Sequence, residues 1–195
     1  MLRAVSPVVQ TARVVLERST PDDADALIED SDPAVMRYLT GGEPENAPEV
    51  VRELVIPSIL AGYERWGGKL GLFAAHENDS GAFIGWFCLR PERGGPTDEV
   101  ELGYRLRQEA WGKGYATEGS QALLARAFTG LDVRLVWGET MCVNLPSQKV
   151  MEKAGMTIAK SIPTPDDMLM VENAELGGLR YEITKEQWEQ PLEAE

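Results

Sequence analysis

The spacing of apolar and polar positions along the chain predicts one strand followed by helices in the first third, and mostly strands from residue 70 to residue 106. Residues 13–18 form a short apolar run that predicts a first strand, and Thr20 and Pro21 then begin a stretch with helical spacing. Helices are predicted over residues 22–28, 33–39 and 48–65. Pro57 lies inside the last of these and is expected to kink it, because proline lacks a backbone donor and crowds the preceding turn.

Strand patterns follow in the middle of the chain. Residues 70–75 and 82–89 are apolar, and the turn-forming residues 78–81 between them predict a hairpin. Residues 99–106 alternate, which places Tyr104 and Leu106 on the apolar face. The remaining pattern predicts helices over 114–128 and 146–154 and strands over 133–141, 156–162 and 179–184. The expected fold class is α/β of the α+β type, in a single domain over residues 1–195 with its core at about 13–184.

Composition narrows the possible classes of function. The chain has 195 residues, of which 43% are hydrophobic, so it can bury a sizeable core. No apolar run approaches the roughly 20 residues of a membrane span, and residues 1–10 lack the apolar segment of a secretion signal. Cys88 and Cys142 lie in apolar runs, which fits buried thiols in a reducing cytoplasm. The net charge of −13 opposes nucleic-acid binding and favours a cationic partner such as an amine, although solubility alone also explains it.

Two glycines mark the most informative segment, residues 107–116. Gly112 and Gly114 lie between a predicted strand and a predicted helix, where backbone N–H groups and the helix dipole can hold an anion. The small residues Ala116 and Gly119 would let the start of this helix pack closely on the sheet. An ordinary tight turn explains the glycines as well. The segment lacks the third glycine of a dinucleotide-binding fingerprint and the Gly-Lys-Ser/Thr of a P-loop.

Residues 104–106 and 111–118 together resemble motif A of the GNAT acetyltransferases, in the branch that contains the ribosomal-protein N-terminal acetyltransferases. A second segment, residues 144–156, is similar to the Asn-x-x-Ser…Glu-Lys-x-Gly-Phe pattern of that branch, with Met156 in place of the usual aromatic residue. The resemblance extends over about residues 13–184. One departure is Glu109, where the superfamily often has Gln or Arg. An acid there should weaken pyrophosphate binding unless it points to solvent or pairs with a neighbouring cation.

The resemblance implies a single mixed, mostly antiparallel sheet of about seven strands with helices on both faces. The sheet would be splayed between its fourth and fifth strands, leaving backbone groups free to bind the pantetheine arm of acetyl-CoA, the implied co-substrate. The Leu106 N–H would bind there and stabilise the oxyanion of the thioester carbonyl. Asn144 and Ser147 would contact the cofactor, and Ser147 would protonate the departing thiolate; each could instead only begin a helix. The CoA pyrophosphate would be held by Gly112, Lys113, Gly114, Tyr115 and Ala116.

The implied activity is N-acetyl transfer to a primary amine, on a protein N-terminus or a small molecule, directly within a ternary complex. An ammonium has no lone pair, so a carboxylate must accept a proton from it. Glu101 and Glu139 are the two candidates, and each could instead be an ordinary solvated or salt-bridged carboxylate. The alternative function is a catalytically silent acyl-CoA-binding or sensing module. A homodimer is also possible, because late strands often meet across a two-fold axis in this superfamily.

Other residues offer weaker hypotheses. His76, the only histidine, is expected to be structural, and the sequence has no cluster with metal-ligand spacing. A covalent relay through Cys142 is not favoured, because direct transfer is usual in the family. Tyr63, Trp66 and Trp86 could line the acceptor pocket, with a core role favoured for Trp86.

Overall fold

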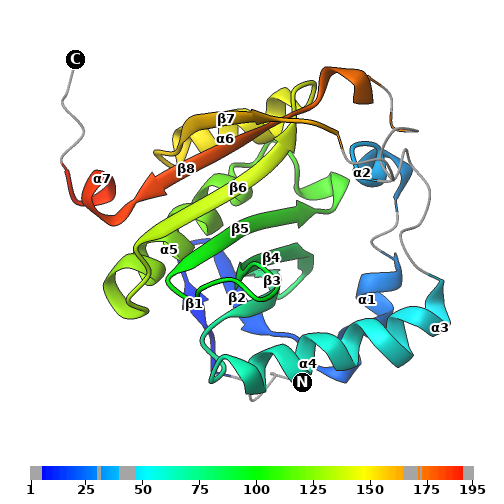
Figure 1. The fold of residues 1–195 in the computed structure, drawn as a ribbon. Helices are drawn as coiled ribbons and strands as arrows, with labels where there is room; N and C mark the ends of the chain where they lie inside the picture. The colour runs from blue at the N-terminus through cyan, green and yellow to red at the C-terminus, as the bar shows by residue number, and fades with distance from the viewer. Residues whose placement is uncertain (1–5, 30–31, 40–46, 165–170, 172, 191–195) are drawn as a thin grey trace.

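The central feature of the fold is one twisted sheet. A computed structural model describes residues 6–29, 32–39, 47–164, 171 and 173–190. The strands are β1 Val9–Gln10, β2 Val14–Arg18, β3 Gly71–Glu77, β4 Phe83–Pro91, β5 Glu99–Leu106, β6 Leu135–Met141, β7 Thr157–Ile162 and β8 Gly178–Thr184. They lie in the order β1-β2-β3-β4-β5-β6-β8-β7, and β5–β6 is the one parallel pair among these described strands (Figure 1). The predicted mixed, mostly antiparallel sheet is therefore confirmed, and β1 adds a strand to the predicted seven.

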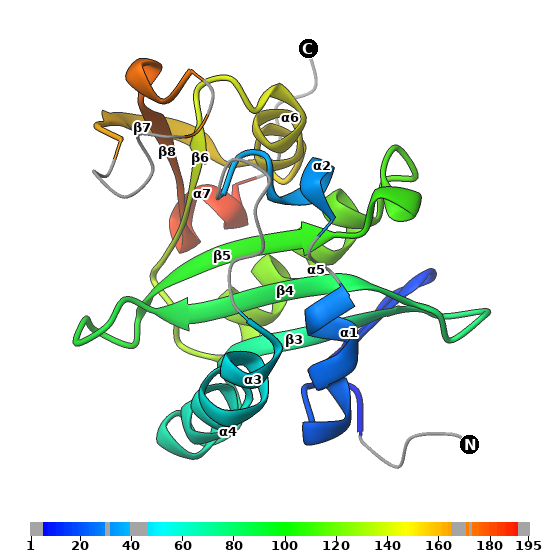
Figure 2. The same ribbon diagram turned by 90° about the vertical axis from the view of Figure 1, so that its right-hand side faces the viewer.

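Helices cover both faces of the sheet, as expected. Their bounds are α1 Ala24–Glu29, α2 Pro33–Met36, α3 Pro48–Val50, α4 Ile56–Arg65, α5 Tyr115–Gly130, α6 Leu145–Lys153 and α7 Lys185–Glu189. Helices α1, α3 and α4 lie in front of the sheet in Figure 2, and α5 lies behind it. Leu27 and Ile56 pack with Trp86 on one face, whereas Phe128 of α5 and Met151 of α6 belong to the main core on the other. No helix in the described part of the chain is long and apolar enough to cross a membrane.

Helix α5 lies unusually close to the sheet at Gly119. A Cβ atom on Gly119 would lie 2.4 Å from Cζ of Phe87, which is fully buried on β4. Only a residue without a side chain allows this approach, because real Cβ contacts are never so short. The predicted close packing at this position is confirmed, and it fixes where the start of α5 lies relative to β4.

The irregularity expected at Pro57 takes the form of a π-helical turn, Val51–Val55, between α3 and α4. The Ile56 N–H donates to the Val51 carbonyl, one residue further back than in an α-helix. This widened turn stands directly before the proline, whose ring would otherwise crowd the preceding carbonyl.

Helices α2 and α7 differ from the predictions. Helix α2 ends at Met36 rather than at residue 39. Helix α7 was not predicted, although the sequence carries its signal: Thr184 and Gln187 form a reciprocal capping box at its start.

Candidate functional site

The glycine loop, residues 111–114, joins the end of β5 to the start of α5. Gly112 and Gly114 have φ values of 71° and 84°, in the left-handed region that favours glycine. Gly114 is the N-cap of α5, and the first intrahelical bond runs from the Glu118 N–H to the Gly114 carbonyl at 3.0 Å. The amides of the residues between them, 115–117, therefore have no acceptor within the helix. This end of α5 has the open N–H groups and positive dipole that bind an anion.

Strands β5 and β6 separate close to the glycine loop. Their parallel ladder pairs residues 99–101 with residues 135–137 and then stops. The Arg107 N–H donates to the Ile84 carbonyl at 3.0 Å, on the β4 side of the strand. Because backbone direction alternates along a strand, Tyr104 and Leu106 turn their N–H groups the other way, into the gap between β5 and β6. The expected splay between the fourth and fifth predicted strands is thus confirmed, with Leu106 at its edge.

Trp111 connects the glycine loop to the end of β5. Its indole N–H donates to the Leu106 carbonyl at 2.8 Å, although the side chain remains 47% exposed. This bond ties the glycine loop back to the last residue of β5 and fixes the loop's position relative to the gap.

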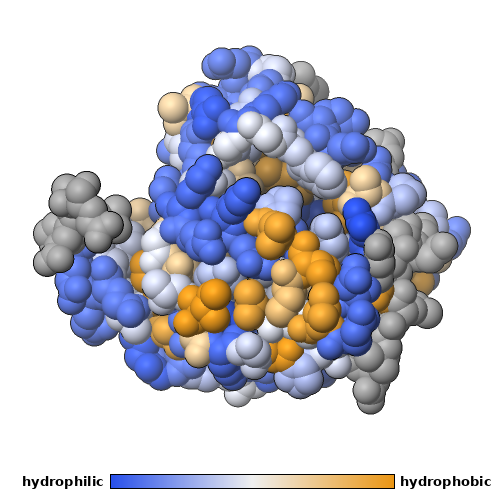
Figure 3. Space-filling model, turned by 90° about the horizontal axis from the view of Figure 1, so that it is seen from above, coloured by the Kyte–Doolittle hydropathy of each residue, from blue (hydrophilic) through white to orange (hydrophobic). Residues whose placement is uncertain are grey.

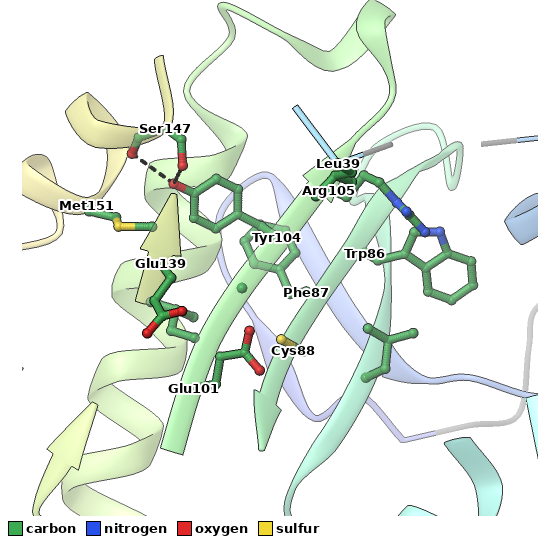
Figure 4. Close-up of a pocket in the computed structure, with 13 residues that line it drawn as sticks. Leu39, Trp86, Phe87, Cys88, Glu101, Tyr104, Arg105, Glu139, Ser147 and Met151 are labelled. Atoms are coloured by element: carbon green, nitrogen blue, oxygen red, sulfur yellow. Dashed lines mark hydrogen bonds between the residues drawn. The ribbon is translucent and has the colours of Figure 1, made fainter. Parts of the chain in front are cut away.

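A cavity of about 220 Å³ lies beside the gap (Figure 4). It is lined by Leu39, Leu72, Trp86, Phe87, Cys88, Glu101, Leu102, Gly103, Tyr104, Arg105, Glu139, Ser147 and Met151. Gly103 creates part of this space, because a Cβ atom there would lie 2.8 Å from Sγ of Cys88. Burial raises the pKa of the Cys88 thiol to about 12, so Cys88 stays protonated and is a poor nucleophile.

One end of the cavity carries a pair of hydroxyl groups. The Tyr104 hydroxyl lies 3.0 Å from Oγ of Ser147 and 3.0 Å from the Ser147 carbonyl oxygen. Tyr104 stands opposite Phe87 in the β4–β5 register and shares the sheet face covered by α5 and α6. Burial raises the pKa of Tyr104 to about 12, although the bond to Ser147 opposes the rise. The phenol therefore stays protonated and can donate a hydrogen bond at neutral pH.

Two carboxylates stand on the other face of the sheet. Glu101 is opposite Arg90 in the register and accepts a hydrogen bond from its Nε at 3.0 Å. Glu139 lies two residues beyond the Glu101 partner on β6, so both side chains share one face, and its Oε1 is 3.3 Å from Nη1 of Arg180. Both carboxylates line the cavity and both are partly exposed. The cavity thus has carboxylates on one side of the sheet and hydroxyls on the other (Figure 4).

Asn144 caps helix α6 and accepts a hydrogen bond from the Ser147 N–H at 3.3 Å. Its side chain therefore holds Ser147 at the first turn, next to Tyr104.

Among the weaker candidates, Trp86 both lines the cavity and belongs to the core, whereas Tyr63, Trp66, His76 and Cys142 are absent from the cavity lining. Glu109 is exposed on the short turn before the glycine loop. No group of His, Cys, Asp and Glu side chains within the described residues could hold a metal ion.

Sequence reasoning missed two residues beside the site. Tyr104 was grouped with the apolar face of its strand, and its partner Ser147 is 43 positions away. Arg13 reaches the glycine loop from the start of β2, where its Nη1 donates to the Lys113 carbonyl at 2.9 Å. No local pattern identifies either contact, because both join segments that are distant in sequence.

The comparisons with known proteins agree with this geometry. Residues 13–157 match the model of the acetyltransferase (GNAT) domain. The chain is 31% identical over 193 residues to the FsC-acetyl coenzyme A-N(2)-transacetylase of Aspergillus fumigatus, covering 93% of this chain and 78% of that protein. A structure of the ribosomal L7/L12 α-N-protein acetyltransferase RimL with coenzyme A matches with a TM-score of 0.75 at 14% identity, over 92% of this chain and 98% of that one. The aminoglycoside acetyltransferase AAC(6')-Ib with coenzyme A matches with a TM-score of 0.69 at 22% identity, over 90% and 97% of the two chains.

A splayed sheet beside a helix end with open amides is the geometry that an acyl-CoA-dependent acyltransferase needs. The chain belongs to the acetyltransferase (GNAT) domain family, and it is an N-acetyltransferase with acetyl-CoA as co-substrate. Its residues fit that molecule. The open amides at the start of α5 suit a pyrophosphate, and the backbone of β5 that faces the gap suits an arm built of amides.

Proposed function

We propose that the protein transfers an acetyl group directly from acetyl-CoA to a primary amine, within a ternary complex. The observation that carries this proposal is the cavity beside the β5–β6 gap, with carboxylates on one face of the sheet and the Tyr104–Ser147 pair on the other. An acceptor amine and a leaving thiolate need opposite proton transfers. Carboxylates that can accept a proton and hydroxyls that can donate one both line this cavity.

The co-substrate binds through the backbone in this proposal. The pyrophosphate lies against residues 112–116, and the pantetheine arm follows β5 along the gap, close to Asn144 and Ser147. The N–H groups of Tyr104 and Leu106 both face this gap, and Tyr104 also lines the cavity. The Leu106 N–H stabilises the negative charge that develops on the thioester oxygen, as an oxyanion-hole donor does, and the Tyr104 N–H, about 6.6 Å further back along the strand, binds the pantetheine arm.

Proton transfer follows from the arrangement of the side chains. Glu139 or Glu101 accepts a proton from the ammonium of the acceptor, directly or through water. The neutral nitrogen then attacks the thioester carbon, the C–S bond breaks, and the Tyr104–Ser147 pair supplies a proton to the thiolate from the Ser147 hydroxyl. The carboxylate releases its first proton to solvent and then takes the second proton from the nitrogen, and a proton from solvent restores the Tyr104–Ser147 pair.

The acceptor is a small-molecule amine or a protein N-terminus. The A. fumigatus relative carries "N(2)-transacetylase" in its name, and the two coenzyme A complexes are named for a protein α-amine and an aminoglycoside. The net charge of −13 and the two carboxylates at the cavity favour an acceptor that arrives as a cation. Both cysteines are free thiols, which fits a cytoplasmic enzyme.

Homodimerisation belongs to the same proposal. Strand β7 is the last strand of the sheet in the described structure, and five of its six residues are exposed. Ile158 on it is 55% exposed, and the molecule seen from this end has an apolar band within a hydrophilic surface (Figure 3). A second copy pairing along β7 would cover Ile158 and the other exposed residues of this strand. Light scattering should give twice 21.5 kDa; a single-chain mass at all concentrations excludes the dimer.

Release of free CoA tests the enzymatic function. Acetyl-CoA is incubated with amino-acid α-amines, short peptides with different N-termini, and aminoglycosides, and the thiol is titrated over time. We expect amine-dependent CoA release for one of these classes, with mass spectrometry showing one acetyl group on the product. Binding of acetyl-CoA without release for any amine would instead support the silent-module alternative.

A further inference from the structure

Arg13 makes several contacts around the glycine loop, although it lies 100 positions before Lys113 in the sequence. Its Nε and Nη2 bind Oε2 of Glu118 at 2.7 and 2.5 Å, and its Nη1 donates to the Lys113 carbonyl at 2.9 Å. Its guanidinium carbon lies 5.2 Å from the centre of the Tyr115 ring. One side chain thus contacts the loop, the first residue of α5 and the first turn of that helix.

The bond to Lys113 determines how the next amide points. In a trans peptide the carbonyl of one residue and the N–H of the next point in opposite directions. Since Arg13 binds the Lys113 carbonyl, the Gly114 N–H points away from Arg13, on the side of the loop opposite the guanidinium. The left-handed conformation of Gly114, with φ of 84°, then starts helix α5. Arg13 therefore holds the first amide of the anion-binding end in a fixed direction.

The bonds from Arg13 to Glu118 neutralise a negative charge at the start of α5. Glu118 lies in the first turn of α5, near the place proposed for a pyrophosphate, where a free carboxylate would repel the ligand. Four donors bind this carboxylate: Nε and Nη2 of Arg13 at 2.7 and 2.5 Å, the Arg13 backbone N–H at 2.9 Å, and the Thr11 hydroxyl at 2.6 Å. Burial opposes its ionisation, but the bonds from Thr11 and Arg13 outweigh burial and lower the pKa of Glu118. The side chain is a carboxylate at neutral pH, and Arg13 neutralises it.

We propose that Arg13 is a positioning residue for the pyrophosphate of acetyl-CoA, which orients the Gly114 amide and cancels the charge of Glu118. This inference rests on the proposed binding of the pyrophosphate at residues 112–116. Arg13 itself needs no contact with the ligand, and its effect is confined to the phosphate end of the molecule. The thioester end, the gap and the carboxylates of the cavity are unaffected.

Three variants separate the two proposed roles of Arg13, which are to orient the Gly114 amide and to cancel the charge of Glu118. Arg13→Gln leaves the Glu118 charge uncancelled and should raise the Kd of acetyl-CoA about tenfold, through repulsion between the carboxylate and the pyrophosphate. Glu118→Gln keeps an acceptor for Thr11 and Arg13 without the charge, so its Kd should equal or fall below that of the wild type. The double variant should recover part of the tenfold loss, because the uncompensated carboxylate is gone.

The ligand provides a second readout that a general structural defect would not produce. S-acetyl-pantetheine lacks the pyrophosphate, so its KM should be the same for Arg13→Gln and the wild type, while the KM of acetyl-CoA rises and kcat stays unchanged. Arg134→Gln is the matched control, because it also removes an exposed arginine paired with two carboxylates, Asp98 and Glu99, far from the glycine loop.

Failure of this inference is distinguishable from failure of the proposed binding site. If Gly112→Val/Gly114→Val binds acetyl-CoA normally, the pyrophosphate lies elsewhere and the proposed site is wrong. If that variant loses binding but Arg13→Gln does not, the site stands and the role of Arg13 is overturned. The role is also overturned if Arg13→Gln weakens both thioesters equally, or if the double variant binds no better than Arg13→Gln alone.

Discussion

The hydroxyl of Tyr104 lies 3.0 Å from the hydroxyl of Ser147, across the place where β5 and β6 separate. Ser147 is in the first turn of α6 and Tyr104 is near the end of β5, so the pair bridges two elements at the head of the gap. Because either hydroxyl can donate to the other, the two can pass a proton along and restore it from Tyr104 after Ser147 has given one up.

Removal of the phenolic hydroxyl should slow the reaction without weakening co-substrate binding. Tyr104→Phe keeps the buried ring but leaves Ser147 without its partner, and we expect kcat to fall roughly 10²-fold, the lower end for lost proton transfer. The kcat of Ser147→Ala should fall at least as far. The kcat of the double variant should be only slightly lower, since the two residues act as a unit. Steady-state kinetics and acetyl-CoA titration measure both effects. Losses that multiply in the double variant would contradict a shared role.

The protonation of Tyr104 predicts a distinct alkaline transition. Burial raises its pKa from 10.0 to about 12, so the folded protein binds this proton more tightly than the unfolded chain does. The resulting stability is fully present below pH 10 and is lost as the pH rises from 10 to about 12. Ultraviolet titration of tyrosinate should show a late component that is missing in Tyr104→Phe. A complete titration of all five tyrosines near pH 10 would disprove the shift.

The sequence predicted most of the fold because each strand has a local apolar pattern. The strand at residues 99–106 and the start of α5 after Gly114 agree with the structure within one residue. Two-residue strand β1 has too short a pattern to be recognised. Three residues proposed from the sequence line the cavity: Glu101, Glu139 and Ser147. Tyr104 lines it too, but it occupies a position that alternation assigns to the core.

The glycine loop should control co-substrate binding through its backbone. A valine at either φ of +71° or +84° is strained, so Gly112→Val/Gly114→Val should distort the loop and block its amides. We expect the acetyl-CoA-dependent rise in Tm to disappear, since a ligand stabilises only the state that binds it. Gly94→Val is the matched control: Gly94 has a φ of 79° and open space around it, but lies in the β4–β5 loop. It should keep the full shift, and a full shift in the double variant would refute the loop's role.

The close packing at Gly119 predicts that adding a side chain there lowers the stability of the protein. In Gly119→Ala the new methyl group would lie 2.4 Å from Phe87, so α5 or the ring must move. Overpacking of this kind costs about 1–3 kcal/mol in the free energy of unfolding. For a chain of this size, each kcal/mol lowers Tm by about 2–4 °C. Gly130→Ala, at the other end of the same helix with no atom within 4 Å of the new Cβ, should leave Tm unchanged or slightly raised. Equal Tm values for the two variants would show that the helix shifts without penalty.

The two carboxylates of the cavity differ in how firmly arginine holds them. Glu101 accepts from Nε of Arg90 at 3.0 Å. Glu139 is 3.3 Å from Arg180, whose Nε binds Glu182 at 2.7 Å, so the charge of Arg180 is divided between two carboxylates. The less tightly held Glu139 is freer to turn towards an amine and accept its proton, and we assign it the larger part of the base function.

Glutamine substitution tests this assignment, because glutamine keeps the shape and hydrogen bonds of glutamate but cannot accept the proton. We expect Glu139→Gln to lower kcat by roughly 10²–10⁴-fold and Glu101→Gln to lower it less, with the Kd of acetyl-CoA nearly unchanged in both. Activity of Glu139→Gln should recover in part as the pH approaches the pKa of the acceptor amine, where more of the amine is already neutral. Glu99→Gln, on the same strand as Glu101 but paired with Arg134, is the control and should keep wild-type kcat. Near-normal kcat at neutral pH in Glu101→Gln/Glu139→Gln would exclude a carboxylate base on these strands. The proton would then have to leave through water and backbone carbonyls, or the acceptor would have to arrive neutral.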